Sequence, residues 1–416
     1  MLKNYLLTAL SVYRKRKMFT AINLMCIVLT LVVLLVVTSI MEHSFSPSGV
    51  DVNRDRIVNV DRYIKSSESK QGSTTVMMSG LGFKLIDQYL KPIKSAEKVC
   101  MVTRSFPVAV YLGERVEKLA IVFTDSVFWE IYSYQLKEGR FFNREDVDQG
   151  RSQLILNTLI AERLFGSQSA IGKKLNVRGQ QYEVTGVVDD GRGRGGEPKM
   201  WAPLTTMPTG VYSESLMGDF HAVLMAKSVA EVSTLKREVS VVGKSIKEKD
   251  PVKWPTTMLI ANTQFDSFAR GFLSDVRQED SGAEWVFGSI LLLMFVFMLL
   301  PALNLVNLNL GRMMERSAEI GVRKAFGASR LELVGQFLVE NVVLSLIGCL
   351  IALALTQLFL MWVNQIGLIP ELKLGVNFPV FGYGVLITII FGIVSGVIPA
   401  WRMARLDPVV ALKGNA

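Results

Sequence analysis

Four long runs of the 416-residue chain contain no Lys, Arg, Asp or Glu, and they limit its fold more than any other feature. A helix of roughly 20 apolar residues crosses the hydrocarbon core of a bilayer, and each run is longer than that. Helices of soluble proteins rarely stay uncharged over such a length, because one face meets water. The sequence therefore predicts four transmembrane helices, within Met18–Met41, Trp285–Gly311, Asn341–Pro370 and Leu374–Trp401.

The basic residues in excess of the acidic ones lie at three places, residues 1–17, 312–332 and 402–416. These segments hold 13 basic and 4 acidic residues, so they account for the whole formal net charge of +9. Four spans put all three segments on one side of the membrane, and loops rich in Lys and Arg face the cytoplasm. We therefore expect cytoplasmic termini and an outer location for residues 42–283. A basic chain can also bind nucleic acid, but this distribution argues against it.

The expected fold is an α-helical membrane protein with four transmembrane helices and a large extracytoplasmic α+β domain of two subdomains. Residues 1–17 have an amphipathic pattern that predicts a cytoplasmic interfacial helix, with a disordered basic tail as the alternative. The expected parts are that helix at 1–17, transmembrane helices at 18–41, 284–311, 330–363 and 378–401, the outer domain at 42–283, a cytoplasmic loop at 312–329, a short outer loop at 364–377 and a cytoplasmic tail at 402–416.

The outer segment mixes strand-like and helical patterns, which is typical of an α+β domain. Thr158–Phe165 has helical spacing, and Gly166 suits the left-handed residue that often ends a helix. Residues 174–188 contain two strand-like runs around Arg178–Gln180, which predicts a β-hairpin. Residues 99–110 are expected to form one strand.

Small residues are spaced four apart in the last two uncharged runs. Gly348 precedes Ala352, and Gly392 precedes Gly396. Such pairs put two small side chains on one helix face, where a neighbouring helix can approach closely. We expect helix contacts at these positions, although the spacing also arises by chance in apolar sequence.

The stretch Gly311–Glu332 lies between the second and third runs and has a helical pattern of its own. Glu319 and Arg323 are four apart in the favourable acid-first order. Gly327 then suits a helix end, and Ser329–Glu332 has the spacing of a capping box that opens a second helix. The predicted short helix has one apolar face, made of Ala318, Val322, Ala325 and Phe326. A solvated loop helix without a partner is the alternative.

The sequence lacks the patterns that would indicate catalysis. It has two histidines, His43 and His221, and no Cys or His cluster with metal-ligand spacing. It has no nucleophile elbow and no phosphate-binding loop. No charged pair lies in mid-membrane to relay protons. We therefore expect no enzyme activity, no metal and no cofactor in this chain, and energy supplied by another subunit.

Three stretches together resemble the MacB/FtsX-type permease subunits of ABC transporters. Glu315–Ser329 reads ERSAEIGVRKAFGAS and is similar to the family's cytoplasmic loop. Pro399–Leu412 is similar to its C-terminal ending, with Asp407 and Pro408 at the matching positions. The third stretch lies in the outer segment, where the similarity to the family's periplasmic core covers Glu138–Phe142, Ala161–Gly166, Ile171–Gly172 and Val184–Val188.

The resemblance implies an inner-membrane protein of a bacterium with a MacB-like periplasmic core domain at 42–283. In this family two permease protomers pair, and each binds a cytoplasmic ABC ATPase. The chain has no ATPase domain of its own, so the resemblance implies a separate ATPase that binds the ATP and magnesium. The second protomer could be identical or a paralogue. The positions that the resemblance assigns to ATPase coupling are Glu315, Arg316, Glu319, Gly321, Arg323 and Gly327.

The resemblance implies mechanotransmission, in which movement of the ATPase reaches the outer domain through the membrane helices. One expected role is export or extraction of a peptide, antibiotic or lipoprotein, together with a periplasmic adaptor or partner protein. The alternative is a non-transporting FtsX-like subunit that activates a periplasmic partner such as a cell-wall hydrolase. A membrane-anchored enzyme is a third hypothesis, and the missing catalytic residues argue against it. The sequence does not name the substrate.

Overall fold

The structure is a computed structural model whose described residues fall into two compact units, each considered separately. The helical unit comprises Met1–Ser44, Phe287–Leu368 and Lys373–Ala416, and the sheet unit comprises Phe45–Val286 with Ile369–Leu372. The structure describes residues 9, 11–14, 17–68, 74–112, 115–189, 200–207, 214–272, 278–315, 322, 326, 329–366 and 374–404.

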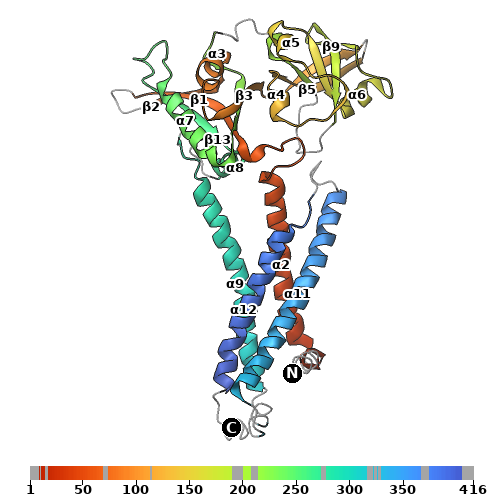
Figure 1. Cartoon of the computed structure of the whole chain (residues 1–416), viewed down its shortest axis with the longest axis vertical. Coiled ribbons are helices and arrows are strands. Elements are labelled where there is room, and N and C mark those ends of the chain that lie inside the picture. The colour runs from red at the N-terminus through yellow and green to blue at the C-terminus, as the bar shows by residue number, and fades with distance from the viewer. Residues whose placement is uncertain are drawn as a thin grey trace. The chain divides into compact units, whose positions relative to one another are not determined.

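Four long helices coincide with the four uncharged runs: α2 (Lys17–Phe45), α9 (Ala283–Glu315), α11 (Arg330–Ile366) and α12 (Phe378–Ala404) (Figure 1). Two of them, α2 and α11, contain apolar stretches long enough to cross a membrane. Within the described side chains of α9 and α12, the apolar stretch is shorter. The helices are therefore of membrane type, and the count of four spans stays a prediction.

Small residues lie where α2, α11 and α12 touch. A Cβ placed on Gly348 of α11 would come within 2.7 Å of Ile27 in α2. A Cβ on Gly392 of α12 would come within 2.9 Å of the Ser345 hydroxyl in α11. Ala352 is fully buried. The predicted close contacts at Gly348 and Gly392 are confirmed, because no larger side chain fits there without displacing its neighbour.

The sheet unit is built on one mixed sheet of 13 strands, in the order β10-β7-β9-β8-β4-β5-β3-β12-β1-β2-β11, with β13 on β1 and β6 on β9. The strands are β1 (Ile57–Glu68), β2 (Thr74–Leu81), β3 (Ala96–Thr103), β4 (Phe106–Leu112), β5 (Arg115–Thr124), β6 (Leu136–Gly139), β7 (Gln153–Asn157), β8 (Lys174–Val177), β9 (Gln180–Val188), β10 (Met200–Pro203), β11 (Met217–Gly218), β12 (Phe220–Ala226) and β13 (Thr256–Asn262).

Short helices accompany this sheet, and one buried apolar core runs through the unit. The α-helices are α3 (Phe83–Leu85), α4 (Phe128–Ile131), α5 (Arg144–Asp148), α6 (Thr158–Phe165), α7 (Val232–Ser245) and α8 (Gln264–Arg270). The other turns are 3₁₀-helical or, at η2, π-helical: η1 (Arg54–Arg56), η2 (Ile86–Leu90), η3 (Leu204–Thr206) and η4 (Val229–Glu231).

The sheet is narrowest between β3 and β5, where only Val102 and Thr124 pair. On one side lie β1, β2, β3, β11, β12 and β13, and on the other lie β4 to β10. We call these groups the first and second halves of the sheet unit. The Thr124 hydroxyl and the Asp125 backbone N–H both donate to the carbonyl of Met101, so one side-chain and one backbone hydrogen bond reinforce the narrow link.

The prediction of one strand over residues 99–110 is wrong. The chain makes two strands, β3 and β4, which belong to different halves of the unit. β3 pairs mainly with β12, whereas β4 pairs with β5 and β8. Arg104 and Ser105, two consecutive exposed polar residues, separate the strands, so the break has a local signal that the prediction overlooked.

Two local predictions are confirmed in the second half. Helix α6 ends at Phe165, and Gly166 follows it with φ +64° while its N–H donates to the carbonyl of Glu162. The hairpin β8–β9 turns at Arg178 and Gly179, whose φ values are +55° and +88°. Two consecutive positive φ values indicate a type I′ turn, which matches the twist of the paired strands.

Candidate functional site

The six predicted coupling positions lie at the end of α9 and in the segment between α9 and α11. Glu315 is the last residue of α9, and nothing is described of its side chain. Arg316, Glu319, Gly321, Arg323 and Gly327 lie outside the described residues. Their role in coupling therefore stays a prediction.

Two residues of the predicted apolar face are described within this loop. The backbone N–H of Phe326 donates to the carbonyl of Val322 at 3.1 Å, the spacing of one α-helical turn. The side chain of Phe326 is 89% exposed and that of Val322 is 44% exposed. An aromatic ring with this exposure contributes little to the packing of the chain itself, so it is available to a partner.

The predicted capping box at the start of α11 is confirmed. The backbone N–H of Ser329 donates to the Glu332 carboxylate at 2.9 Å, and the N–H of Glu332 donates to the Ser329 hydroxyl at 3.3 Å. The box fixes the first turn of α11 three residues after Phe326, so the exposed turn and the helix start are closely connected.

A second arrangement, at α8 in the sheet unit, was missed by the sequence reasoning. Asp266 lies in the first turn of α8, and its side chain is 3% exposed. Its carboxylate accepts hydrogen bonds from the Thr263 backbone N–H at 2.8 Å and the Thr263 hydroxyl at 2.7 Å. Lys236 of α7 donates to the same carboxylate at 2.8 Å, and the Ser281 hydroxyl donates to its other oxygen.

Arg270, the last residue of α8, also binds the segment that precedes Ser281, by donating to its backbone carbonyls. Its guanidinium donates to the carbonyls of Gln278 and Glu279 at 2.8 and 2.9 Å, and to the Asn262 side chain at 2.8 Å. We call Lys236, Thr263, Asp266, Arg270 and Ser281 the α8 cluster.

The other end of the sheet unit also packs on α8. Phe45 is the last residue of α2, and its ring makes edge contacts with Phe265 and Phe268 at centroid distances of 5.1 and 5.2 Å. Ser281 comes two residues before α9 begins. Helix α8 thus contacts the chain at both points where the sheet unit is joined to a long helix.

The charge of Asp266 is favoured by this environment. Burial opposes ionisation, but the hydrogen bonds from Lys236, Ser281 and Thr263 outweigh it and hold the pKa of Asp266 below its ordinary value. The spacing Thr263-x-x-Asp266 is a capping-box signal, so the start of α8 could have been found from sequence. The contacts of Lys236 and Ser281 have no such local signal.

Family models match both parts of the chain. A model described as the MacB-like periplasmic core domain matches residues 20–242, more than half of the chain. A second model, the FtsX-like permease C-terminal region, matches residues 291–408.

Several relatives align over most of the chain. The ABC transporter permease YknZ of Bacillus subtilis is 26% identical over 78% of this chain and 77% of its own length. The macrolide export ATP-binding/permease protein MacB of Pasteurella multocida is 25% identical over 68% of this chain. The pyoverdine export protein PvdT of Pseudomonas aeruginosa is 24% identical, also over 68%. The aligned region spans only 41% of each of these last two proteins.

Two solved structures give weak matches in the same region. The periplasmic region of MacB from Actinobacillus actinomycetemcomitans aligns over 55% of this chain and 96% of its own, with 14% identity and a TM-score of 0.39. The extracellular domain of YknZ aligns over 49% and 99%, with 16% identity and a TM-score of 0.37. Because the two family models match residues 20–242 and 291–408, the chain belongs to the MacB/FtsX family of ABC transporter permeases.

Proposed function

We propose that this chain is a permease subunit that works with a separate cytoplasmic ABC ATPase. In this proposal the ATPase binds the ATP and magnesium, and the chain itself hydrolyses nothing. The turn Val322–Phe326 docks on the ATPase, and movement of the ATPase displaces the long helices. The helices then move the sheet unit, so ATP hydrolysis does mechanical work outside the cytoplasm.

The exposed turn next to the capping box carries this proposal. An apolar helical face that packs on a groove is a common recognition mode, and Phe326 offers such an anchor. The capping box follows at once, so a push on the turn acts on the first turn of α11. Nearby charges at Glu319 and Arg323 would set the register and the association rate more than the affinity.

The contacts of α8 support the proposed transfer of movement from the long helices to the sheet unit. A displacement of α2 or α9 arrives at Phe45 or Ser281, and both residues contact α8. Hydrogen bonds to buried charged groups are strong and directional, so this joint resists stretching more than a loop would.

We further propose a multi-pass protein of a bacterial inner membrane, with four spans and both termini cytoplasmic. The basic segments at the helix ends support this orientation. A second permease protomer, identical or a paralogue, completes the assembly, and a periplasmic adaptor is a further proposed partner.

Export or extraction of a substrate such as a peptide, antibiotic or lipoprotein is the favoured role. It is supported by relatives that are named for export of macrolides and of pyoverdine. The second candidate is activation of a periplasmic partner, such as a cell-wall hydrolase, without transport. A sheet unit with two distinct halves favours the first role, because it offers surface for a substrate as well as for a partner.

Charge and polarity changes in the turn test the docking step. The chain is co-expressed with a candidate ABC ATPase from the same organism, and the ATPase is recovered by pull-down from solubilised membranes. We expect Phe326→Asp to reduce recovery at least tenfold, because an aspartate cannot fill an apolar groove. Glu319→Lys and Arg323→Glu should weaken recovery as well.

Val252→Asp is the matched control, since Val252 is 90% exposed and belongs to the sheet unit. It should recover the ATPase as well as the unmodified chain does. Equal recovery with Phe326→Asp and with both charge reversals would refute docking through this turn.

A further inference from the structure

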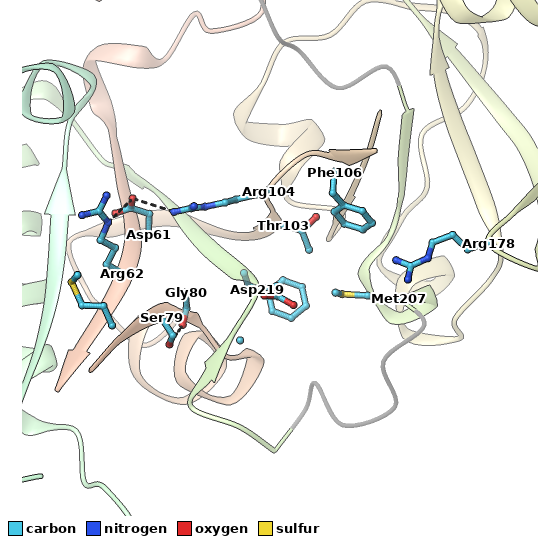
Figure 2. A pocket seen from close by; sticks show the side chains of 13 residues that line it. Asp61, Arg62, Ser79, Gly80, Thr103, Arg104, Phe106, Arg178, Met207 and Asp219 are labelled. Carbon is cyan, nitrogen blue, oxygen red and sulfur yellow. Dashed lines mark hydrogen bonds and ion pairs between the residues drawn. The ribbon is translucent and has the colours of Figure 1, made fainter. Parts of the chain in front are cut away.

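The sheet unit contains a cavity of about 700 Å³ between its two halves. Strands β1, β2, β3, β11 and β12 line it from the first half, and β4, Met207 after η3 and the β8–β9 turn line it from the second (Figure 2). Its volume lies within the range of pockets that hold small organic ligands, about 300–1,000 Å³. The α8 cluster shares no residue with this lining.

Apolar side chains form one part of the cavity wall. Phe106 and Met207 come from the second half of the unit, and Phe220 comes from the first. Figure 2 shows Phe106 and Met207 on the same side of the cavity as Arg178. Aromatic and thioether side chains of this kind adapt to flat or irregular apolar groups, so the wall suits a hydrophobic ligand body.

Arg178 is the most unusual residue of the lining. Among the described residues it is the only one other than glycine with a positive φ, at +55°. The first central position of a type I′ turn normally holds Asn, Asp or Gly, and a residue with a longer side chain there costs on the order of 1 kcal/mol. The guanidinium of Arg178 points from the turn toward Phe106 and Met207 (Figure 2). Backbone strain of this kind is common at ligand-binding sites, so the strained position of Arg178 in the cavity wall indicates a binding role for its side chain.

The charged lining is positive on balance. The lining contains three arginines, Arg62, Arg104 and Arg178, and two carboxylates, Asp61 and Asp219. Asp61 lies between Arg62 and Arg104, at 3.6 and 3.9 Å from their nitrogens, so one carboxylate serves two cations. The lining therefore favours a negatively charged group over a positive one.

We propose that this cavity binds a small amphipathic anion, with its acidic group on Arg178 and its apolar body against Phe106, Met207 and Phe220. A guanidinium offers a carboxylate, sulfonate or phosphate two parallel hydrogen bonds, which fixes the orientation of the ligand. Because the ligand touches both halves of the unit, it binds best at one separation of the halves. The only strand pairing of β3 with β5, at Val102 and Thr124, lies between those halves, so an occupied cavity biases their separation.

Binding of a defined probe by the full chain tests this proposal. The chain is reconstituted in nanodiscs of zwitterionic phosphatidylcholine and titrated with 8-anilinonaphthalene-1-sulfonate, with empty nanodiscs subtracted. N-phenyl-1-naphthylamine has the same aromatic body without the sulfonate and serves as the neutral probe. The anionic probe should bind, and its affinity should fall as the salt concentration rises.

Arg178→Gly separates binding from folding. Glycine adopts the positive φ without strain, so this variant should be at least as stable as the unmodified protein. Its affinity for the sulfonate should fall about 10- to 100-fold, which is the value of a hydrogen-bonded charge pair. Arg178→Lys should retain most of the affinity, because it keeps the positive charge.

Arg237→Ala is the matched control, since Arg237 is an exposed arginine of α7 that does not line the cavity. It should bind the probe normally. Unchanged sulfonate affinity in Arg178→Gly would overturn the proposal. So would equal affinity for the neutral probe, because the anionic group would then contribute nothing.

Discussion

Substitution of Asp266 tests whether movement of α9 is transmitted to the sheet unit through α8. In Asp266→Asn the side chain keeps its shape but loses its charge, and with it the ion pair to Lys236 at 2.8 Å. The bonds from the Thr263 backbone and hydroxyl also change from a charged to a neutral acceptor. Hydrogen bonds to a charged group contribute about 1.5–3 kcal/mol, compared with about 1 kcal/mol for neutral ones.

We therefore expect the substitution to weaken the α8 cluster by about 1–3 kcal/mol. The central core of the unit, which includes Leu154 and Ile155, makes none of these contacts and should keep its stability. A local loss of this size raises the rate of amide exchange through local opening by about 5- to 150-fold. Hydrogen exchange followed by mass spectrometry should show faster exchange at residues 263–272 and 278–283, and unchanged exchange in β7 and β9.

The control is Asp250→Asn. Asp250 is an exposed carboxylate that accepts from the backbone N–H of Lys253, outside the α8 cluster. It should leave exchange at residues 263–283 as it is. Unchanged exchange in Asp266→Asn would refute the reasoning that this carboxylate holds α8 to the start of α9.

The same variant should reduce the movement of the sheet unit without changing the rate of ATP hydrolysis. In the complex with its ATPase, Asp266→Asn should hydrolyse ATP at an unchanged rate, because the substitution is remote in sequence from the docking turn. Movement of the sheet unit, measured by distances between spin labels on its two halves, should become smaller. Equal movement would contradict transmission through α8.

The remaining predictions concern the second half of the sheet unit and the topology. Hydrogen bonds from Arg140, with those from Asn143 and Arg151, hold the pKa of the buried Asp146 carboxyl well below its ordinary value, so its stabilising charge is present above about pH 4 and is lost as the pH falls below that. Asp146→Asn should therefore lower the free energy of unfolding by about 1–3 kcal/mol near pH 7, and by progressively less in acid, as measured by denaturant titration at several pH values. Cysteines placed at Ser215 and Ser317 should be labelled from outside and from the cytoplasm respectively, and the reverse pattern would contradict the proposed orientation.

Local sequence patterns were sufficient where the structure depends on near neighbours. The capping box at Ser329 and Glu332, the end of α6 at Gly166 and the turn at Arg178 each involve residues at most four apart. The long helices also follow from the sequence, because the absence of charge over a whole run needs no knowledge of other segments. The contact positions Gly348 and Gly392 were predicted from another local pattern, the spacing of small residues four apart.

Other features needed the fold, because they join residues that are far apart in the chain. Residues 99–110 were predicted as one strand, but β3 pairs mainly with β12 and β4 pairs with β5, so the two strands belong to different halves of the sheet unit. The α8 cluster brings Lys236 to Asp266 across 30 residues, and no periodic pattern links them.

By itself, the sequence determined the apolar helices, the distribution of charge and the local helix ends and turns, since each depends on side chains within a few residues of one another. Only the tertiary structure decided which carboxylate joins the sheet unit to α9, and which arginine faces the cavity between the two halves. The physical reason is that hydrogen bonds and cavities form between surfaces, and folding determines which surfaces meet.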